Sequence, residues 1–163
     1  MFIASILVLA SLSPVSLASG PHGFGASEGF PSDVLVLYDP SDEQLALRAN
    51  ALALLVREHY PNVLLLPIHD RWELNRALSS PALVAVYMFH GRPRGMVVGG
   101  EPITWRDVAS TVSRSAIRHH VFECCFSARL YAYGLDEDRV SAVRGVIDAQ
   151  WASTMPPARW PAS

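Results

Sequence analysis

The sequence predicts an α/β fold, a three-layer αβα sandwich in which helices cover both faces of a mostly parallel sheet of about five strands. Short runs of consecutive apolar residues recur along the chain, as in strands that are buried on both faces. Segments with helical spacing of apolar residues separate these runs and begin with capping residues. This alternation favours parallel βαβ units with right-handed crossovers. With 163 residues, half of them apolar, the chain has the size of one such domain with a substantial core.

In the first half of the domain, the sequence predicts three strands with two helices between them. Ser41 and Gln44 are expected to form a capping box for the first helix, and Asp70 and Glu73 one for the second. Pro61 ends the first helix, because proline cannot continue it. The three strands are expected at residues 33–38, 63–66 and 82–89.

The second half of the domain begins with a hairpin and then returns to the sheet. Residues 96–103 surround Gly99-Gly100, which is typical of a two-residue hairpin turn. The remaining elements are expected as a helix from 104 to about 114, a fourth strand over 121–124, a short helix over 127–133 closed by Gly134, and a fifth strand over 143–151.

The two ends of the chain differ from the domain, which is expected over residues 33–152. An apolar stretch at residues 2–10 and the small residues Ser16 and Ala18 predict a signal peptide over 1–18, hence a secreted or otherwise extracytoplasmic protein. An uncleaved anchor or a mis-set start is the alternative, since no positive residue precedes the stretch. Residues 19–32 read as a flexible leader and 153–163 as an irregular tail.

The composition argues against several classes of function. Thirteen basic and fifteen acidic residues leave a net charge of −2 with no basic stripe, so neither nucleic acid nor, after signal cleavage, a membrane is an expected partner. Every basic residue is an arginine, which rules out a lysine nucleophile, Schiff base or phosphate-loop lysine. No glycine-rich loop follows the first strand, which weighs against a nucleotide or flavin. We expect no cofactor, and two adjacent cysteines without further ligands favour no metal site.

Polar residues follow three of the predicted strands: Asp39 the first, His90-Gly91 the third and Cys125 the fourth. Because ligands of open parallel sheets bind outside the carboxyl ends of the strands, these residues are expected at one rim. Side chains alternate along a strand, so Glu123 shares the face of Cys125 while Cys124 points into the core. A histidine and a cysteine on neighbouring strand ends suit thiol chemistry.

The other histidines carry less information. His119 and His120 are interpreted as a solvated turn before the fourth strand, with a loosely bound metal as the minor alternative. His59 suits the negative end of a helix dipole, and His69 is interpreted as a loop residue beside a cap.

Taken in order, these segments resemble the caspase-like cysteine peptidases, the group that includes caspases, metacaspases, legumain, gingipain and the CHAT-type peptidases. Those enzymes place a His-Gly after the third strand and the nucleophile after the fourth. The stretch Glu123-Cys124-Cys125-Phe126-Ser127-Ala128 is similar to the E-A-C-E-S-G form of their nucleophile motif. Residues 95–112 resemble the insertion of CHAT-type members, and residues 145–151 are similar to the strand that follows there. The resemblance spans residues 33–151 and implies the flavodoxin-like strand order 2-1-3-4-5.

The resemblance implies a cysteine endopeptidase with a Cys-His dyad that works through an acyl-enzyme. Cys125 is the implied nucleophile and His90 the group that protonates the leaving amine. The backbone N–H groups of Gly91 and Cys125 are the implied oxyanion hole. A peptide or protein is therefore the expected substrate.

The resemblance also gives an expectation for substrate specificity. In this group the residue two before the nucleophile lines the pocket for the substrate residue before the cut, so Glu123 favours a basic residue there, with Asn as second choice. Asp39 and Asp148 are expected to add negative charge to the same pocket.

Two other classes of function stay open. One is an exported binding or regulatory module, a caspase-like domain without activity, and the other is a flavodoxin-like ligand-binding domain with incidental cysteines. Ala128 stands where the group often has glycine, and little chain follows the fifth predicted strand, so we expect a homodimer or another partner to complete the pocket. No G-x-C-x-G or G-x-S-x-G elbow is present, which disfavours an amidotransferase or an α/β-hydrolase.

Overall fold

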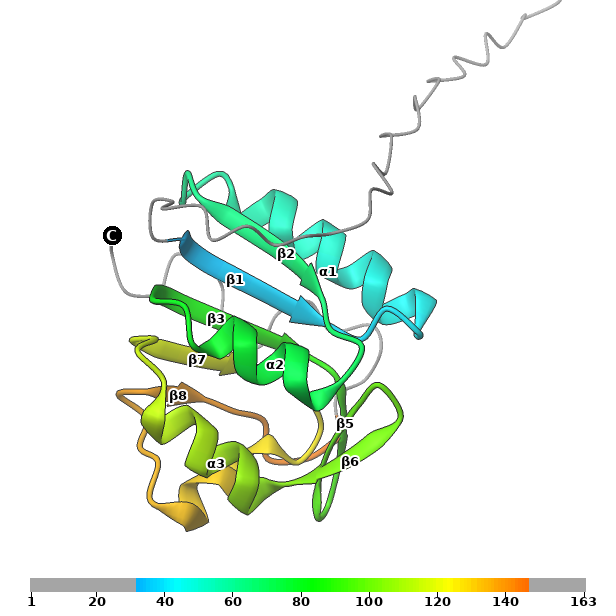
Figure 1. Cartoon of the computed structure of the whole chain (residues 1–163), viewed down its shortest axis with the longest axis vertical. Helices are drawn as coiled ribbons and strands as arrows, with labels where there is room; N and C mark the ends of the chain where they lie inside the picture. The colour runs from blue at the N-terminus through cyan, green and yellow to red at the C-terminus, as the bar shows by residue number, and fades with distance from the viewer. Residues whose placement is uncertain (1–31, 147–163) are drawn as a thin grey trace, which may run out of the picture.

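The main sheet of the protein has five parallel strands. The computed structural model describes residues 32–146 and orders these strands β2-β1-β3-β7-β8 (Figure 1), which agrees with the predicted order. The strands are β1 (Ser32–Tyr38), β2 (Val63–Pro67), β3 (Ala82–Met88), β7 (His119–Phe122) and β8 (Val140–Ser141).

Helices cover both faces of this sheet, so the α/β class and the three layers are as predicted. Helix α1 (Glu43–Val56) lies on one face, and α2 (Arg71–Leu78) and α3 (Trp105–Arg114) lie on the other (Figure 1). Side chains alternate between the two faces of the sheet and so contribute to two separate hydrophobic cores. Val34 and Val36 of β1 pack on the α1 side, while Leu35 and Leu37 of the same strand pack on the α2 side.

Three side chains cap the helices. Asp42, not the expected Ser41, is the N-cap of α1, where its Oδ1 accepts the N–H groups of Gln44 and Leu45. Asp70 and Thr104 cap α2 and α3 as expected, each accepting the N–H three residues on. Ser41 instead donates its hydroxyl to Asp39 (2.6 Å), and this turn places Asp42 at the helix start.

A second, antiparallel sheet contains the predicted hairpin and one strand that the sequence did not reveal. Its strands are β4 (His90–Arg92), β5 (Gly95–Val98) and β6 (Glu101–Thr104). The turn residues Gly99 and Gly100 have φ values of 57° and 83°, which glycine adopts without strain. A Cβ on Gly99 would lie 1.7 Å from the His69 carbonyl oxygen, so the hairpin tip rests on the loop that follows β2.

The carboxyl-terminal part of the domain departs most from the prediction. Strand β7 ends at Phe122, and the short 3-10 helix η1 (Ser127–Tyr133) ends at Gly134 as predicted. The fifth strand is Val140–Ser141, not 143–151. The Asp136 carbonyl accepts the N–H groups of Arg139 and Val140, and its carboxylate also accepts that of Arg139, so the chain enters the sheet there. Residues 143–145 bond to the loop after Cys125 instead, and residues 147–151 of the predicted strand lie outside the described residues. The predicted signal peptide and tail and residues 19–31 of the predicted leader also lie outside them, whereas Ser32, the last residue of the predicted leader, begins β1.

His119 and His120 are buried in β7, which corrects their interpretation as a solvated turn. His119 is 5% exposed, and its ring bonds to the Asp138 carbonyl and the Ser141 hydroxyl. The His120 ring lies between the Tyr87 hydroxyl (2.8 Å) and the Ser115 hydroxyl (3.0 Å). Because all four ring nitrogens bond to protein groups, they are not presented to a metal ion.

The direction of the hydrogen bonds around His120 can be assigned. Ser115 donates its hydroxyl proton to the Val112 carbonyl and so accepts from His120 Nε2. Nδ1 then accepts from the Tyr87 hydroxyl, and the ring is neutral. Burial, helped by the Arg139 and His119 charges, lowers the pKa of His120 to about 3.

This buried ring predicts acid sensitivity. Between pH 6.5 and 3 the unfolded chain binds a proton at His120 that the folded chain does not, so stability falls as pH falls. From pH 7 to pH 5 the free energy of unfolding is expected to drop by about 2 kcal/mol from this residue. Urea unfolding of wild type and His120→Gln at both pH values checks this, and an equal drop in the two proteins would refute it.

Candidate functional site

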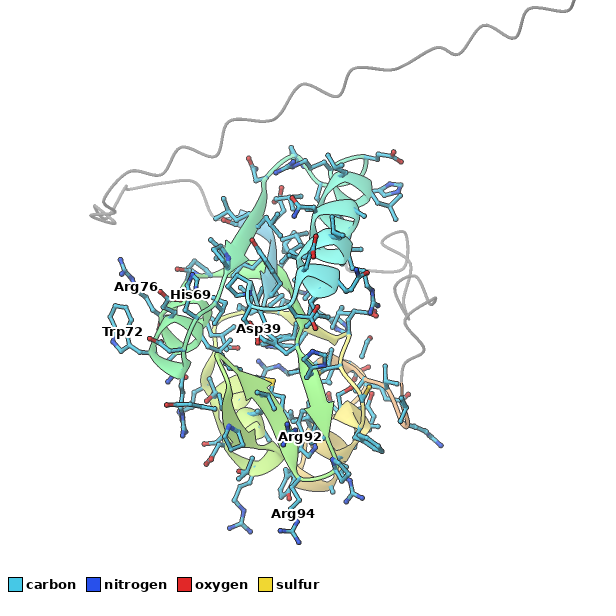
Figure 2. The ribbon with its side chains drawn as sticks, turned by 90° about the vertical axis from the view of Figure 1, so that its right-hand side faces the viewer. Asp39, His69, Trp72, Arg76, Arg92 and Arg94 are labelled. Atoms are coloured by element: carbon cyan, nitrogen blue, oxygen red, sulfur yellow. The ribbon has the colours of Figure 1, made fainter. Side chains whose placement is uncertain are left out.

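The carboxyl ends of β1, β3 and β7 meet at one edge of the sheet, where their arrowheads point in Figure 1. Figure 2 looks at this edge, with Asp39 near its centre and Arg92 and Arg94 on the hairpin beside it. The structure brings His90, Gly91 and Cys125 together here. The first two follow β3 directly in β4, and Cys125 follows β7.

Gly91 lies against the backbone of Cys125. A Cβ at position 91 would lie 1.8 Å from the Cys125 carbonyl oxygen and 2.6 Å from its carbonyl carbon and nitrogen. Only a residue without a side chain allows this approach. The contact joins the strand that carries His90 to the residue that carries the candidate thiol.

The strand register also directs the polar groups of Gly91. Val98 and Glu101 flank the two-residue turn and therefore form a hydrogen-bonded pair. Hydrogen-bonded pairs recur at every second residue, so Met96 also directs its backbone N–H and C=O toward β6. Gly91 stands opposite Met96 on the other side of β5 and is therefore at a non-hydrogen-bonded position. Its N–H and C=O consequently point away from β5.

The two cysteines have opposite environments. Cys124 is 1% exposed and belongs to the core, whereas Cys125 is partly exposed. Burial, together with the charges of Cys125 and Glu123, raises the pKa of the Cys124 thiol far above its usual range, although the Ser127 hydroxyl opposes this. Cys124 is therefore an inert core residue, as the alternation of side chains predicted, and Cys125 is the more exposed of the two cysteines.

The loop after Cys125 is strained and firmly held. Phe126 has a φ of 60°, the one positive value outside glycine among residues 32–146, and this costs about 1 kcal/mol for an aromatic residue. Its N–H donates to the Gly145 carbonyl (2.8 Å), and Ala128 N–H donates to the Val143 carbonyl (2.9 Å). Segment 143–145 thus holds the loop in the conformation that positions Cys125.

His90 has a partner that the sequence did not reveal. Its Nε2 lies 2.7 Å from Oδ2 of Asp42, while its side chain is 61% exposed. The Asp42 pKa is lowered, first by the Leu45 N–H and then by His90, so the carboxylate is ionised and accepts the Nε2 proton. Nδ1 is the nitrogen that remains for chemistry.

The predicted substrate-binding carboxylates are buried. Glu123 and Asp39 are each 3% exposed, and Glu123 N–H continues the ladder by donating to the Tyr87 carbonyl (3.0 Å). Oδ1 of Asp39 accepts both the N–H and the hydroxyl of Ser41, so this carboxylate also shapes the turn before α1. Asp148 lies outside the described residues.

A hollow in the α2 side of the molecule is separate from this site. It lies between α2, α3 and the second sheet, and its lining includes Leu74, Leu78, Met96, Ile103 and Val108. Neither His90 nor Cys125 lines it. The largely apolar lining marks it as a gap in the packing of the core rather than a site for the proposed chemistry.

No protein-family model matches the chain, and no curated protein matches it. Within residues 32–146, none of the helices combines the length and apolar character needed to cross a membrane. In the same range, no three histidine, cysteine, aspartate or glutamate side chains gather into a potential metal site.

Proposed function

We propose that this chain is a cysteine endopeptidase of caspase-like type, in which Cys125 is the nucleophile and His90 the acid-base group. The observation that carries the proposal is the close approach of Gly91 to the Cys125 backbone, because it joins the strand that carries His90 to the residue that carries the candidate thiol. The five-stranded order and the buried neighbour Cys124 support the same assignment.

The reaction begins when the Cys125 thiolate attacks the carbonyl carbon of the scissile peptide bond. As the tetrahedral intermediate collapses, the C–N bond breaks, and the leaving amine takes a proton from Nδ1 of His90. Water then attacks the thioester and gives a proton back to His90. The C–S bond breaks, which releases the carboxylic acid and regenerates the Cys125 thiolate beside the protonated His90. Gly91 N–H, pointing away from β5, is proposed to stabilise the oxyanion together with Cys125 N–H.

Asp42 is the proposed positioning residue for His90. Its ionised carboxylate holds Nε2–H and stabilises the imidazolium that forms when His90 takes up a proton. Asp42→Ser keeps a good N-cap for α1 but cannot supply the anion. We expect this variant to keep its stability and its KM, and to lose about 10- to 100-fold in kcat, because His90 is largely exposed and more weakly dependent on its partner than a buried one.

The measurement for Asp42 is steady-state kinetics beside urea unfolding. Asp42→Ala serves as the comparison, since it loses both the cap and the anion and is expected to lose about 1 kcal/mol of stability as well. Wild-type kcat in a stable Asp42→Ser would remove Asp42 from the site.

The proposed specificity is for Arg or Lys before the cut, with Asn as second choice. The buried carboxylates Glu123 and Asp39, beside the end of β3, are proposed to give this rim a negative character that favours a cation. Asp148 is proposed as a further contributor. Export of the protein, and a second copy or another partner that completes the pocket, belong to the same proposal.

A panel of fluorogenic peptide amides with Arg, Lys, Asn or Asp before the cleaved bond tests this function. Wild type is expected to cleave the Arg and Lys substrates at least tenfold faster than the Asp substrate, and His90→Ala to lose most of that turnover. Equal turnover of the Asp substrate would overturn the specificity. A folded wild-type protein that cleaves no member of a wider panel would favour the alternative, an inactive binding or regulatory module.

A further inference from the structure

His90 and Arg92 share the outer face of the second sheet. They are two residues apart in β4, so their side chains point to the same side, and both residues are exposed while Gly91 between them faces Cys125. The opposite face of the second sheet is core, because Met96, Val98 and Ile103 are at most 4% exposed. Any group that approaches the His90 ring over this face therefore also approaches Arg92.

The Arg92 backbone is anchored, and its guanidinium has no acidic partner among the described residues. The Trp105 indole N–H donates to the Arg92 carbonyl (3.0 Å), and Trp105 N–H donates to the Arg94 carbonyl (3.2 Å). Trp105 is 1% exposed, so this anchor holds the β4–β5 turn against the core. Among residues 32–146, Arg71 pairs with Asp107 and His90 pairs with Asp42, whereas neither Arg92 nor Arg94 takes part in an ion pair.

The charges around the site are therefore divided. Glu123 and Asp39, whose carboxylates are buried, lie beside the end of β3, because their N–H groups donate to the Tyr87 and Met88 carbonyls. The Asp42 carboxylate is occupied by His90 and by the start of α1. The guanidiniums of Arg92, in β4, and of Arg94, in the turn after it, take part in no ion pair among residues 32–146, and both lie on the face of the molecule seen in Figure 2. An anion is favoured on that side.

We propose that Arg92 binds an acidic side chain at one of the first two substrate residues after the scissile bond. This inference rests on the proposed function, in which His90 protonates the leaving amine and so faces the part of the substrate that leaves. Two residues of a strand span about 6.6–6.8 Å, which is also the spacing of alternate side chains in an extended peptide. The Arg92 guanidinium, two residues along β4 from His90, therefore lies where it can contact the leaving segment of the substrate. A guanidinium can bind a carboxylate through two N–H groups.

Internally quenched peptides test this proposal. They carry Arg before the cut and either Asp, Gln or Lys at the first or second position after it, and they are compared in wild type, Arg92→Gln and Arg118→Gln. Arg118 is the matched control, because it is exposed but lies before β7, at the opposite end of the sheet. A peptide amide that ends in a neutral fluorophore reports turnover without any residue after the cut.

Wild type and Arg118→Gln are expected to cleave the Asp peptide with a kcat/KM roughly three- to tenfold above that of the Lys peptide, less at high salt because Arg92 is exposed. Arg92→Gln is expected to bring the peptides within about twofold of each other and to leave the amide unchanged. Two results would overturn the inference while leaving the proposed function in place, provided that the amide is cleaved. One is a wild type that cleaves the Asp and Lys peptides equally well, and the other is an Arg92→Gln variant that still prefers the Asp peptide. Absence of turnover of the amide would overturn the proposed function and the inference with it.

Discussion

Replacing Gly91 with alanine is expected to remove most of the activity, by about a hundredfold or more in kcat/KM. The added Cβ would lie 1.8 Å from the Cys125 carbonyl oxygen, and because this neighbour is backbone rather than a flexible side chain, β4 or the Cys125 loop must move. A displacement near 1 Å in an active site costs on the order of a hundredfold in rate. The same overpacking is expected to lower the free energy of unfolding by about 1–3 kcal/mol.

Two other glycines separate the local effect from general damage. Gly95→Ala makes a similar clash, 1.9 Å from the Ile103 carbonyl oxygen, and is expected to lose comparable stability but far less activity. Gly145→Ala meets nothing within 4 Å on the loop that holds Phe126, and is expected to resemble wild type. Kinetics well below each unfolding temperature provide the comparison. A folded Gly91→Ala with wild-type kcat/KM would contradict the arrangement of the site.

Alanine substitutions of the two cysteines are expected to differ by at least about a hundredfold in their effect on kcat/KM. Cys125→Ala removes the accessible thiol and is expected to lower kcat/KM at least about a thousandfold with little change in stability. Cys124→Ala removes a sulfur from the core, which should cost about 1 kcal/mol of stability while kcat/KM stays within about tenfold of wild type. The same fluorogenic amide and urea unfolding serve both variants. The reverse ranking of the two in kcat/KM would exclude Cys125 as nucleophile.

Local sequence patterns were sufficient for most of the fold. The strands β1, β2 and β3 were predicted because continuous apolar runs between turn signals are typical of buried strands. The hairpin was predicted because two consecutive glycines can adopt the positive φ values of its turn. The fifth strand was wrong because Val140–Ser141 is too short to give a pattern. Its place is set by the turn at Asp136 and by the bonds of 143–145 to the Cys125 loop, which are tertiary interactions.

The candidate site was only partly visible in the sequence for the same reason. Topology was enough to bring His90, Gly91 and Cys125 to one rim, since parallel strands deliver their ends there. Asp42 was missed because Ser41 is an equally good cap by type, and because its partner His90 is 48 residues away. Its position beside a strand end and a helix start was the one available signal.

For His119 and His120 the sequence interpretation was wrong, because it took two buried residues to be solvated. Adjacent histidines at the start of a strand looked solvated because imidazole is polar, yet both are buried. Each finds its partners on distant elements, with Tyr87 and Ser115 around one ring and Ser141 beside the other. A buried polar ring is tolerated when its hydrogen bonds are satisfied, and satisfaction depends on the whole fold.

Covalent labelling tests the central claim most directly. A peptidyl ketone electrophile with Arg before the reactive carbon is incubated with the folded wild-type protein and with His90→Ala, and peptide mass spectrometry locates the adduct. We expect one adduct, on Cys125, formed much more slowly in His90→Ala. An adduct on Cys124, or a Cys125 adduct that forms equally fast without His90, would contradict the pairing of the exposed thiol with the imidazole of the neighbouring strand end.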